Sequence, residues 1–315
     1  NGGRINMGAY GGTAFASKST GVIPVDAPRY VRPATDAWTP SWPYTNWATA
    51  AADIQTALDL ADGQAVYVKA GAYAITNGYL TMRTAQLLGG YLGEGAPGAR
   101  APAPADVCIL DAMFKNRVLY CVGCTPGTLV DGFTICNGYY PTTAGAYGGG
   151  LYINGSTMAV CNNKILNNNL KTGGGLFIAG GSIVAVSNNV IAGNVSVGGG
   201  GLNGAAFSVG DAPTRAFVVN NTIYTNVAYG IGAGYYQSSG YSFLLNNIIV
   251  SNTALGTSKD GGIYVAGGTF SNAYNDVWGN SGLDYHGCSA GVGNIAEDPL
   301  LVGGGAVDAD TRSAI

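Results

Sequence analysis

The sequence carries very little charge. Only 10% of its 315 residues are Asp, Glu, Lys or Arg, and the formal net charge is −3. A surface that binds nucleic acid needs clustered Lys and Arg, so this composition excludes that class of protein. No apolar run approaches the length of about 18 residues that a membrane-spanning helix needs, so we expect no membrane span.

Ligands for metals and cofactors are also scarce. Cys121 and Cys124 have the spacing of half a zinc site, but a structural site needs four ligands and the second pair is missing. His286 is the only histidine. We therefore expect no metal and no cofactor. The cysteines predict buried thiols, or one or two disulfides in an exported protein. They are Cys108, Cys121, Cys124, Cys136, Cys161 and Cys288.

Glycine and asparagine are abundant instead, and they recur in a repeat. Twenty of the 26 asparagines lie between Asn137 and Asn280. Four copies share an apolar residue, an Asn pair, an aliphatic residue and a closing Asn, and two degenerate copies flank them. The aliphatic positions are Ile135, Ile165, Ile191, Ile223, Ile249 and Val277. These positions are 26 to 32 residues apart. Short β-prone segments joined by Asn and Gly at this interval predict one coil of a β-solenoid per repeat.

A second motif of glycines followed by Leu or Ile lies between the Asn copies. It occurs at Gly148–Leu151, Gly173–Leu176, Gly199–Leu202 and Gly261–Ile263. The fold class is therefore all-β, a right-handed parallel β-helix. We expect the Asn pairs to form tight corners, where Asn and Gly tolerate a left-handed backbone. We also expect Asn side chains to bond to each other along the axis, and the aliphatic position to form an inward stack.

The N-terminal third has a different pattern. Residues 47–61 place apolar side chains at helical spacing and predict a short capping helix over the open end of the core. Residues 66–73 predict a first pair of strands, and residues 95–105 a projecting loop. The predicted organisation is a terminal segment at 1–20, a linker with the capping helix at 21–65, the β-helix at 66–303 and an extension at 304–315.

Several of these segments resemble one family. Trp47–Tyr73, Leu87–Tyr91, Val130–Ile135, the Asn repeats and Tyr274–Asn280 resemble the secreted right-handed parallel β-helix proteins, pectin-lyase-like, of environmental bacteria. The resemblance covers residues 28–303 and implies an extracellular or cell-surface location. Because this fold hosts lyases, hydrolases, tailspikes, adhesins and structural repeats, function must be argued from a site.

The first residues resemble a segment that usually closes such a domain. Gly2–Thr13 resembles this closing segment, which usually follows the final coils. Joining Ile315 to Asn1 would restore that order. We therefore expect residues 1–20 to pack on the C-terminal coils of a preceding unit, either as a tandem repeat or as a donated strand. The alternative is a strand that folds back on its own chain. The expected assembly residues are Gly2, Arg4, Ile5, Met7, Tyr10 and Ile315.

Catalytic residues are sparse in the central repeats. Enzymes of this fold need paired carboxylates, or a basic residue that abstracts a proton. Asp111 and Asp131 can face one another across early coils, although turn and cap roles explain them better. Lys164 and Lys171 have no acidic partner nearby in sequence. We expect no catalytic residues. Between Asn137 and Asn275 the charged residues are Lys164, Lys171, Asp211, Arg215, Lys259 and Asp260.

The 20 tyrosines leave two interpretations open. Tyr229, Tyr235 and Tyr236 can contact glycans, or they can pack between neighbouring solenoids. The sequence favours a non-catalytic extracellular structural protein that assembles head-to-tail with itself. The alternatives are a carbohydrate-binding adhesin or tailspike-like module, and a polysaccharide lyase or hydrolase that uses acids near the ends of the helix.

Overall fold

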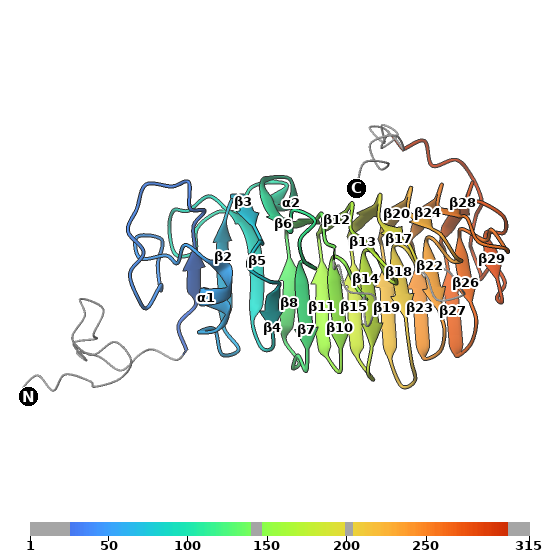
Figure 1. The fold of residues 1–315 in the computed structure, drawn as a ribbon, viewed down its shortest axis with the longest axis horizontal. Helices are drawn as coiled ribbons and strands as arrows, with labels where there is room; N and C mark the ends of the chain where they lie inside the picture. Colours follow the sequence, from blue (N-terminus) through green and yellow to red (C-terminus); the bar gives the residue numbers. More distant parts are fainter. Residues whose placement is uncertain (1–25, 140–146, 199–203, 302–315) are drawn as a thin grey trace, which may run out of the picture.

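The computed structural model describes residues 26–139, 147–198 and 204–301. These residues form an elongated stack of β-coils that runs from β1 to β29 (Figure 1). Every pair of named strands is parallel, and the only helices in the described ranges are α1 (Ile54–Leu58) and α2 (Pro104–Val107). The prediction of an all-β parallel β-helix is confirmed.

The strands of one coil fall in different sheets, so each sheet stacks one strand from successive coils. Sheet A contains β1 (Arg29–Val31), β2 (Ala65–Lys69), β5 (Gln86–Tyr91), β8 (Thr128–Asp131), β11 (Thr157–Cys161), β15 (Ile183–Ser187), β19 (Arg215–Val219), β23 (Tyr241–Leu245) and β27 (Thr269–Ala273). Sheet B contains β3 (Gly71–Ala74), β6 (Cys108–Asp111), β9 (Thr134–Cys136), β12 (Lys164–Leu166), β16 (Val190–Ala192), β20 (Thr222–Tyr224), β24 (Ile248–Val250) and β28 (Asp276–Trp278).

Two further sheets complete the coils. Sheet C contains β4 (Leu80–Met82), β7 (Leu119–Val122), β10 (Leu151–Asn154), β14 (Leu176–Ala179), β18 (Phe207–Val209), β22 (Tyr235–Gln237), β26 (Ile263–Val265) and β29 (Tyr285–His286). Sheet D contains β13 (Asn169–Leu170), β17 (Val195–Ser196), β21 (Val227–Ala228) and β25 (Thr253–Ala254). Sheet A begins at β1, so the sheets start earlier than the residue 66 expected from the sequence.

The aliphatic position of each repeat forms a continuous inward column in sheet B. Ile165 pairs with Ile135 on one side and with Ile191 on the other, and the column continues to Val277. All these side chains are fully buried. Burying an Ile side chain contributes about 1.5–3 kcal/mol, so the column is a main source of stability along the whole axis. The predicted aliphatic stack is confirmed.

The two residues of each Asn pair have different roles. The first takes the left-handed conformation at the corner between sheets A and B, with φ between 53° and 56° in Asn162, Asn188, Asn220 and Asn246. Asn adopts this conformation more readily than most residues, because its short polar side chain bonds locally. The prediction of corners is therefore confirmed for the first member of the pair.

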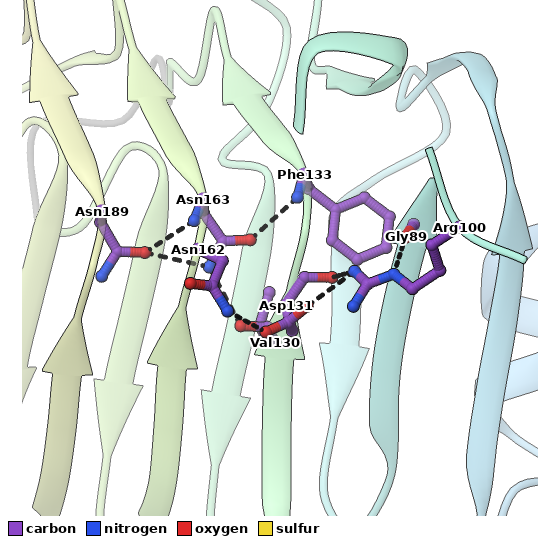
Figure 2. Close-up of polar contacts among 8 residues, drawn as sticks. All are labelled: Gly89, Arg100, Val130, Asp131, Phe133, Asn162, Asn163 and Asn189. Atoms are coloured by element: carbon purple, nitrogen blue, oxygen red, sulfur yellow. Dashed lines mark hydrogen bonds and ion pairs between the residues drawn. The ribbon is translucent and has the colours of Figure 1, made fainter. Parts of the chain in front are cut away.

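The second Asn is buried and forms a ladder along the axis. Asn189 donates from Nδ2 to Oδ1 of Asn221 at 3.0 Å, and its backbone N–H donates to the same oxygen at 3.0 Å. Its Nδ2 also donates to the carbonyl of Val160 at 2.9 Å. The start of this ladder, from Phe133 through Asn163 to Asn189, is seen in Figure 2. The full ladder is Asn163, Asn189, Asn221, Asn247, Asn275 and Asn294.

A second ladder follows sheet B and uses the closing Asn of each repeat. Asn194 donates from Nδ2 to Oδ1 of Asn226 at 3.0 Å and to the carbonyl of Ile165 at 2.9 Å. Each amide thus satisfies a backbone carbonyl and an amide of neighbouring coils, which keeps buried polar groups paired. Bonding from side chain to side chain is confirmed in both ladders. The members of the second are Asn168, Asn194, Asn226, Asn252 and Asn280.

The glycine motif precedes sheet C, where the coils approach closely. A Cβ on Gly149 or Gly150 would lie 2.6 Å from a carbonyl oxygen of the next coil, so only glycine fits. The alignment of this motif needs one correction. Leu176 pairs with Phe207 and not with Leu202, which lies outside the described residues. The longer repeat between Ile191 and Ile223 places extra residues before β18 and shifts the match.

The predicted helix at 47–61 is present but much shorter. Asp53 caps α1 by accepting the N–H of Thr56, and Ile54, Ala57 and Leu58 are buried. Trp47 instead packs edge-on to Tyr30 and donates its indole N–H to the carbonyl of Pro97 at 2.9 Å. Ala51 forms a parallel bridge with Val31, so its backbone bonds to β1 and residues 47–52 are not helical.

Candidate functional site

The residues predicted for assembly lie outside the described part of the chain. Gly2, Arg4, Ile5, Met7, Tyr10 and Ile315 all belong to the ranges that the structure does not describe.

The three candidate tyrosines have very different environments. Tyr235 is fully buried in the inward column of sheet C, and its hydroxyl donates to Ser242 Oγ at 2.5 Å. Tyr236 is 3% exposed, whereas Tyr229 is 55% exposed. Only Tyr229 is available on the surface, so Tyr235 and Tyr236 do not form the external contact expected from the sequence. Alternation along the strand places Tyr235 in the inward column of Leu151 and Leu176. Tyr236 points outward, and its ring packs beside that of Tyr264, with centroids 5.9 Å apart.

An aromatic column follows the outer positions of sheet C. Tyr120 stacks on Tyr152 with centroids 5.2 Å apart, and Tyr152 stacks on Phe177 at 5.7 Å with an interplanar angle of 2°. The guanidinium of Arg117 lies 4.9 Å from the Tyr152 centroid. Because the rings cover each other's faces, this column stabilises the coils and leaves no open face within it for a sugar.

Asp131 and Arg100 form an ion pair at the corner after β8 (Figure 2). Their closest atoms are 2.6 Å apart, and Asn162 Nδ2 donates to the other Asp131 oxygen at 2.6 Å. Arg100 also donates from Nε to the carbonyl of Gly89 at 2.8 Å. The pair ties the loop at 95–105 to the body of the solenoid. This supports a structural role for Asp131.

The other ionisable groups singled out in the sequence also have local partners. Asp111 accepts the N–H of Met113 and the side-chain amide of Asn137, so it is a turn residue and does not face Asp131. Lys164 forms an ion pair with Asp106, which is distant in sequence and was missed for that reason. His286 lies 2.7 Å from Asp260 and stacks on Tyr264 at 4.0 Å. None of these contacts brings two acids together.

All six cysteines are free thiols. Burial raises the pKa of Cys108 and of Cys136 to about 12, and that of Cys288 to about 11. The thiol of Cys121 forms a hydrogen bond with the sulfur of Cys124. This hydrogen bond raises the pKa of Cys121 and lowers that of Cys124. Of the two possibilities left by the sequence, the structure has the free thiols, of which four are buried and two, Cys161 and Cys288, are partly exposed. No cluster of three or more metal-binding side chains occurs among the described residues.

The C-terminal end of the solenoid exposes several apolar side chains. Strands β27, β28 and β29 are the last strands of sheets A, B and C, and they lie at the same end of the stack (Figure 1). Part of the chain crosses them, with Ile295 N–H donating to the Asn275 carbonyl at 2.9 Å. Val292 is 72% exposed, Leu283 56% and Ile295 51%. This end therefore presents apolar side chains beside strand edges.

The N-terminal end is covered by its own chain. Val31 of β1 pairs with Ala51, α1 packs against β4, and a Cβ on Gly71 would meet Pro33 at 2.8 Å. Asp36 accepts from Lys69 at 2.7 Å and from Arg32 at 2.8 Å. Burial raises the pKa of Asp36, but these two bonds outweigh it and lower the pKa overall. The two ends of the solenoid are thus unequal.

The fold and these ends define the class of the molecule, a parallel β-solenoid built from Asn-rich coils. No helix in the described ranges has the length and apolar character to cross a membrane. No protein-family model matches the chain, and no curated protein or solved structure matches it significantly.

Proposed function

We propose that this protein is a non-catalytic structural protein of the cell surface or extracellular space. It serves as a subunit, or as one tandem-repeat period, of a head-to-tail filament or surface layer. The extracellular location rests on the resemblance of its repeats to secreted, right-handed, pectin-lyase-like β-helices.

The observation that carries this proposal is the inequality of the two ends. Edge strands recruit further strands unless they are covered, and proteins usually block them. At the N-terminal end Pro33, Ala51 and α1 supply such cover. At the C-terminal end the chain also crosses the last strands, and Ile295 forms a parallel bridge with Asp276. The apolar side chains there, Leu283, Val292 and Ile295, nevertheless stay exposed. A contact between unlike ends does not close on itself, so it generates a filament.

The occupant of the C-terminal end is proposed to be residues 1–20 of the next unit. This segment carries the apolar residues Ile5, Met7 and Tyr10 among glycines. Added as a strand or as covalently continuous chain, it covers the apolar side chains at that end. Tyr229, exposed on the side of the solenoid, remains available for lateral contact or for glycans.

The test is the state of assembly of the full chain, measured by negative-stain microscopy and light scattering. We expect filaments or chains of units. Deletion of residues 1–20 and the double change Val292→Asp with Ile295→Asp each reduce assembly at least tenfold. Ile183→Asp, at a position 45% exposed on the outer face of sheet A, is the matched control and leaves assembly unchanged.

A monomeric full chain at all concentrations would contradict the non-covalent form of the proposal. The covalent form predicts that two copies fused from Ile315 to Asn1 give one rigid rod of doubled length, and a flexible joint between two rods would contradict it. Robust release of reducing or unsaturated sugar from acidic polysaccharides would overturn the non-catalytic assignment.

A further inference from the structure

The outer face of sheet A between β8 and β27 carries almost no charge. Six strands lie side by side there along the stack (Figure 1). Among their outward residues only Asp131 and Arg215 are charged, and Asp131 is buried within its ion pair. Ile183 is 45% exposed, and Phe217 is partly exposed. A contiguous apolar surface of this kind marks a contact site for another molecule.

The face has a shallow hollow beside a ridge. The hollow has a volume of about 440 Å³ and lies over β11 and β15, where Ala159 and Ala185 form its floor. Ala185 is exposed and Ala159 is partly exposed, so the floor is open to the outside. The ridge begins at the next strand, where Phe217 is in register with Ala185 on one side and with Phe243 on the other. The rings of Phe217 and Tyr241 pack with centroids 6.2 Å apart, which holds the ridge in place.

The neighbouring row of the same face repeats this change from small to large side chains. It runs in register from Cys161 through Ser187 and Val219 to Leu245. In both rows the change falls between β15 and β19. The relief of the face is therefore self-complementary, because its two halves have opposite profiles about one line.

We propose that this face pairs with the same face of a second copy, with the two solenoids antiparallel. A twofold axis that runs along the strands between β15 and β19 relates the copies. It places Phe217 opposite Ala185 and Phe243 opposite Ala159 of the second copy, so each ridge fills a hollow. A twofold axis along the solenoid would place Phe217 opposite Phe217 and leave the hollow empty, so parallel pairing does not fit.

The row beside it fits the same axis, because Val219 then meets Ser187 and Leu245 meets Cys161. The overlap spans six strands of about five residues, which at about 4.8 Å per strand and 3.3 Å per residue buries roughly 1,000 Å² over both copies. Specific interfaces of this area are at the weak end of the range. One pair of copies is therefore a reversible dimer, and repetition along a filament adds the contacts together.

Arg215 lies at the rim of this contact. It is the first residue of β19 and faces Ile183, the first residue of β15, in the second copy. Its aliphatic stem covers the isoleucine while the guanidinium reaches solvent. An acid at position 183 would pair with this guanidinium, so Ile183→Asp leaves the face able to pair. The contact uses neither end of the solenoid and is therefore independent of head-to-tail assembly.

Sedimentation velocity tests the pairing on the full chain carrying Val292→Asp and Ile295→Asp, the changes expected to remove the end contact. We expect a dimer that forms with rising concentration up to about 1 mM. Phe217→Ala empties the hollow and Ala185→Phe collides with the ridge, so each weakens the dimer at least tenfold. The variant with both changes exchanges knob and hollow and restores the affinity to within about threefold.

Tyr229→Ala is the matched control, because it removes an exposed ring outside sheet A and should change the affinity less than twofold. A monomer at all concentrations would leave the face to some other occupant and overturn the proposal. A double variant as weak as the two single ones, or a dimer that neither single change weakens, would also overturn it. If the end contact itself is absent, these outcomes are unaffected, so the two proposals fail separately.

Discussion

At the scale of single residues, the two neighbouring asparagines of one repeat have different structural roles. Asn220 turns the chain at an exposed corner, whereas Asn221 is 1% exposed and holds three coils together. The amide of Asn221 accepts two bonds from Asn189 and donates to Val186 and Asn247. One side chain thus bonds to groups in both neighbouring coils.

Asn221→Ala is therefore expected to destabilise the protein by about 3–4 kcal/mol, because several buried polar groups lose their partner at once. Urea denaturation followed by fluorescence measures the change. Asn220→Gly is the matched control, since glycine accepts the same left-handed corner, and we expect a change below about 0.5 kcal/mol. Equal effects of the two substitutions would show that the ladder is not a source of stability.

The residue scale also shows where sequence reasoning fails. The ladder can be predicted from the Asn repeats, because the amides of equivalent residues must meet when coils stack in register. The Tyr235–Tyr236 pair gives no such signal, because two adjacent tyrosines do not reveal which of them points inward. Aligning Gly234–Tyr235 with Gly175–Leu176 would have placed Tyr235 in the core.

At the scale of elements, the aliphatic and Asn positions predict sheet B and its corners well, whereas sheet C depends on loop length. The repeat between Ile191 and Ile223 is longer than its neighbours, and only the structure shows that Phe207 takes the position of Leu176. The N-terminal helix is shorter than expected because Ala51 pairs with Val31 of β1, and Trp47 packs on aromatic partners that are distant in sequence. Contacts of this kind leave no periodic pattern.

Strand β28 contains an acid whose protonation affects the last coil. Burial raises the pKa of Asp276, and the nearby charges of Glu297, Asp284 and Asp298 raise it further. The native state therefore binds this proton more tightly than the unfolded state does. Its stabilising contribution is present at low pH and is lost as the pH rises through the raised pKa of Asp276.

Asp276→Asn is expected to raise the melting temperature at pH 7 by about 1–3 °C, since it removes the buried charge and keeps the acceptor for the N–H of Glu297. The gain should vanish below about pH 4, where the wild-type carboxyl group is protonated. Thermal unfolding across this range, with exposed Asp59→Asn as control, measures the effect. A gain that is independent of pH would contradict the assignment.

At the scale of the whole molecule, each coil contacts only the coils beside it, so stability is spread along the axis and falls toward uncovered ends. The central coils have fully buried columns and both Asn ladders, whereas the residues after β29 are largely exposed. The N-terminal end is the better protected of the two, because α1 and the segment before it cover its strands.

Hydrogen exchange followed by mass spectrometry should therefore be slowest in β14–β24 and fastest in residues 287–301, with intermediate rates in β1–β4. Formation of the proposed filament should slow exchange at residues 287–301 at least tenfold and leave the central coils unchanged. Uniform exchange along the axis in the isolated unit would contradict this picture of a graded solenoid.

The direction of the Asn ladders has an electrical consequence. In both ladders every side-chain oxygen accepts from the preceding coil, whereas each Nδ2 donates one hydrogen to the oxygen of the following coil, as in Asn189 to Asn221 and Asn226 to Asn252, and one to a carbonyl of the preceding coil. The side-chain dipoles therefore add, as peptide dipoles do in a helix, and their positive pole lies at the C-terminal end. Asn280, last in its ladder, donates to Asp284 at 2.8 Å, so a carboxylate neutralises that pole.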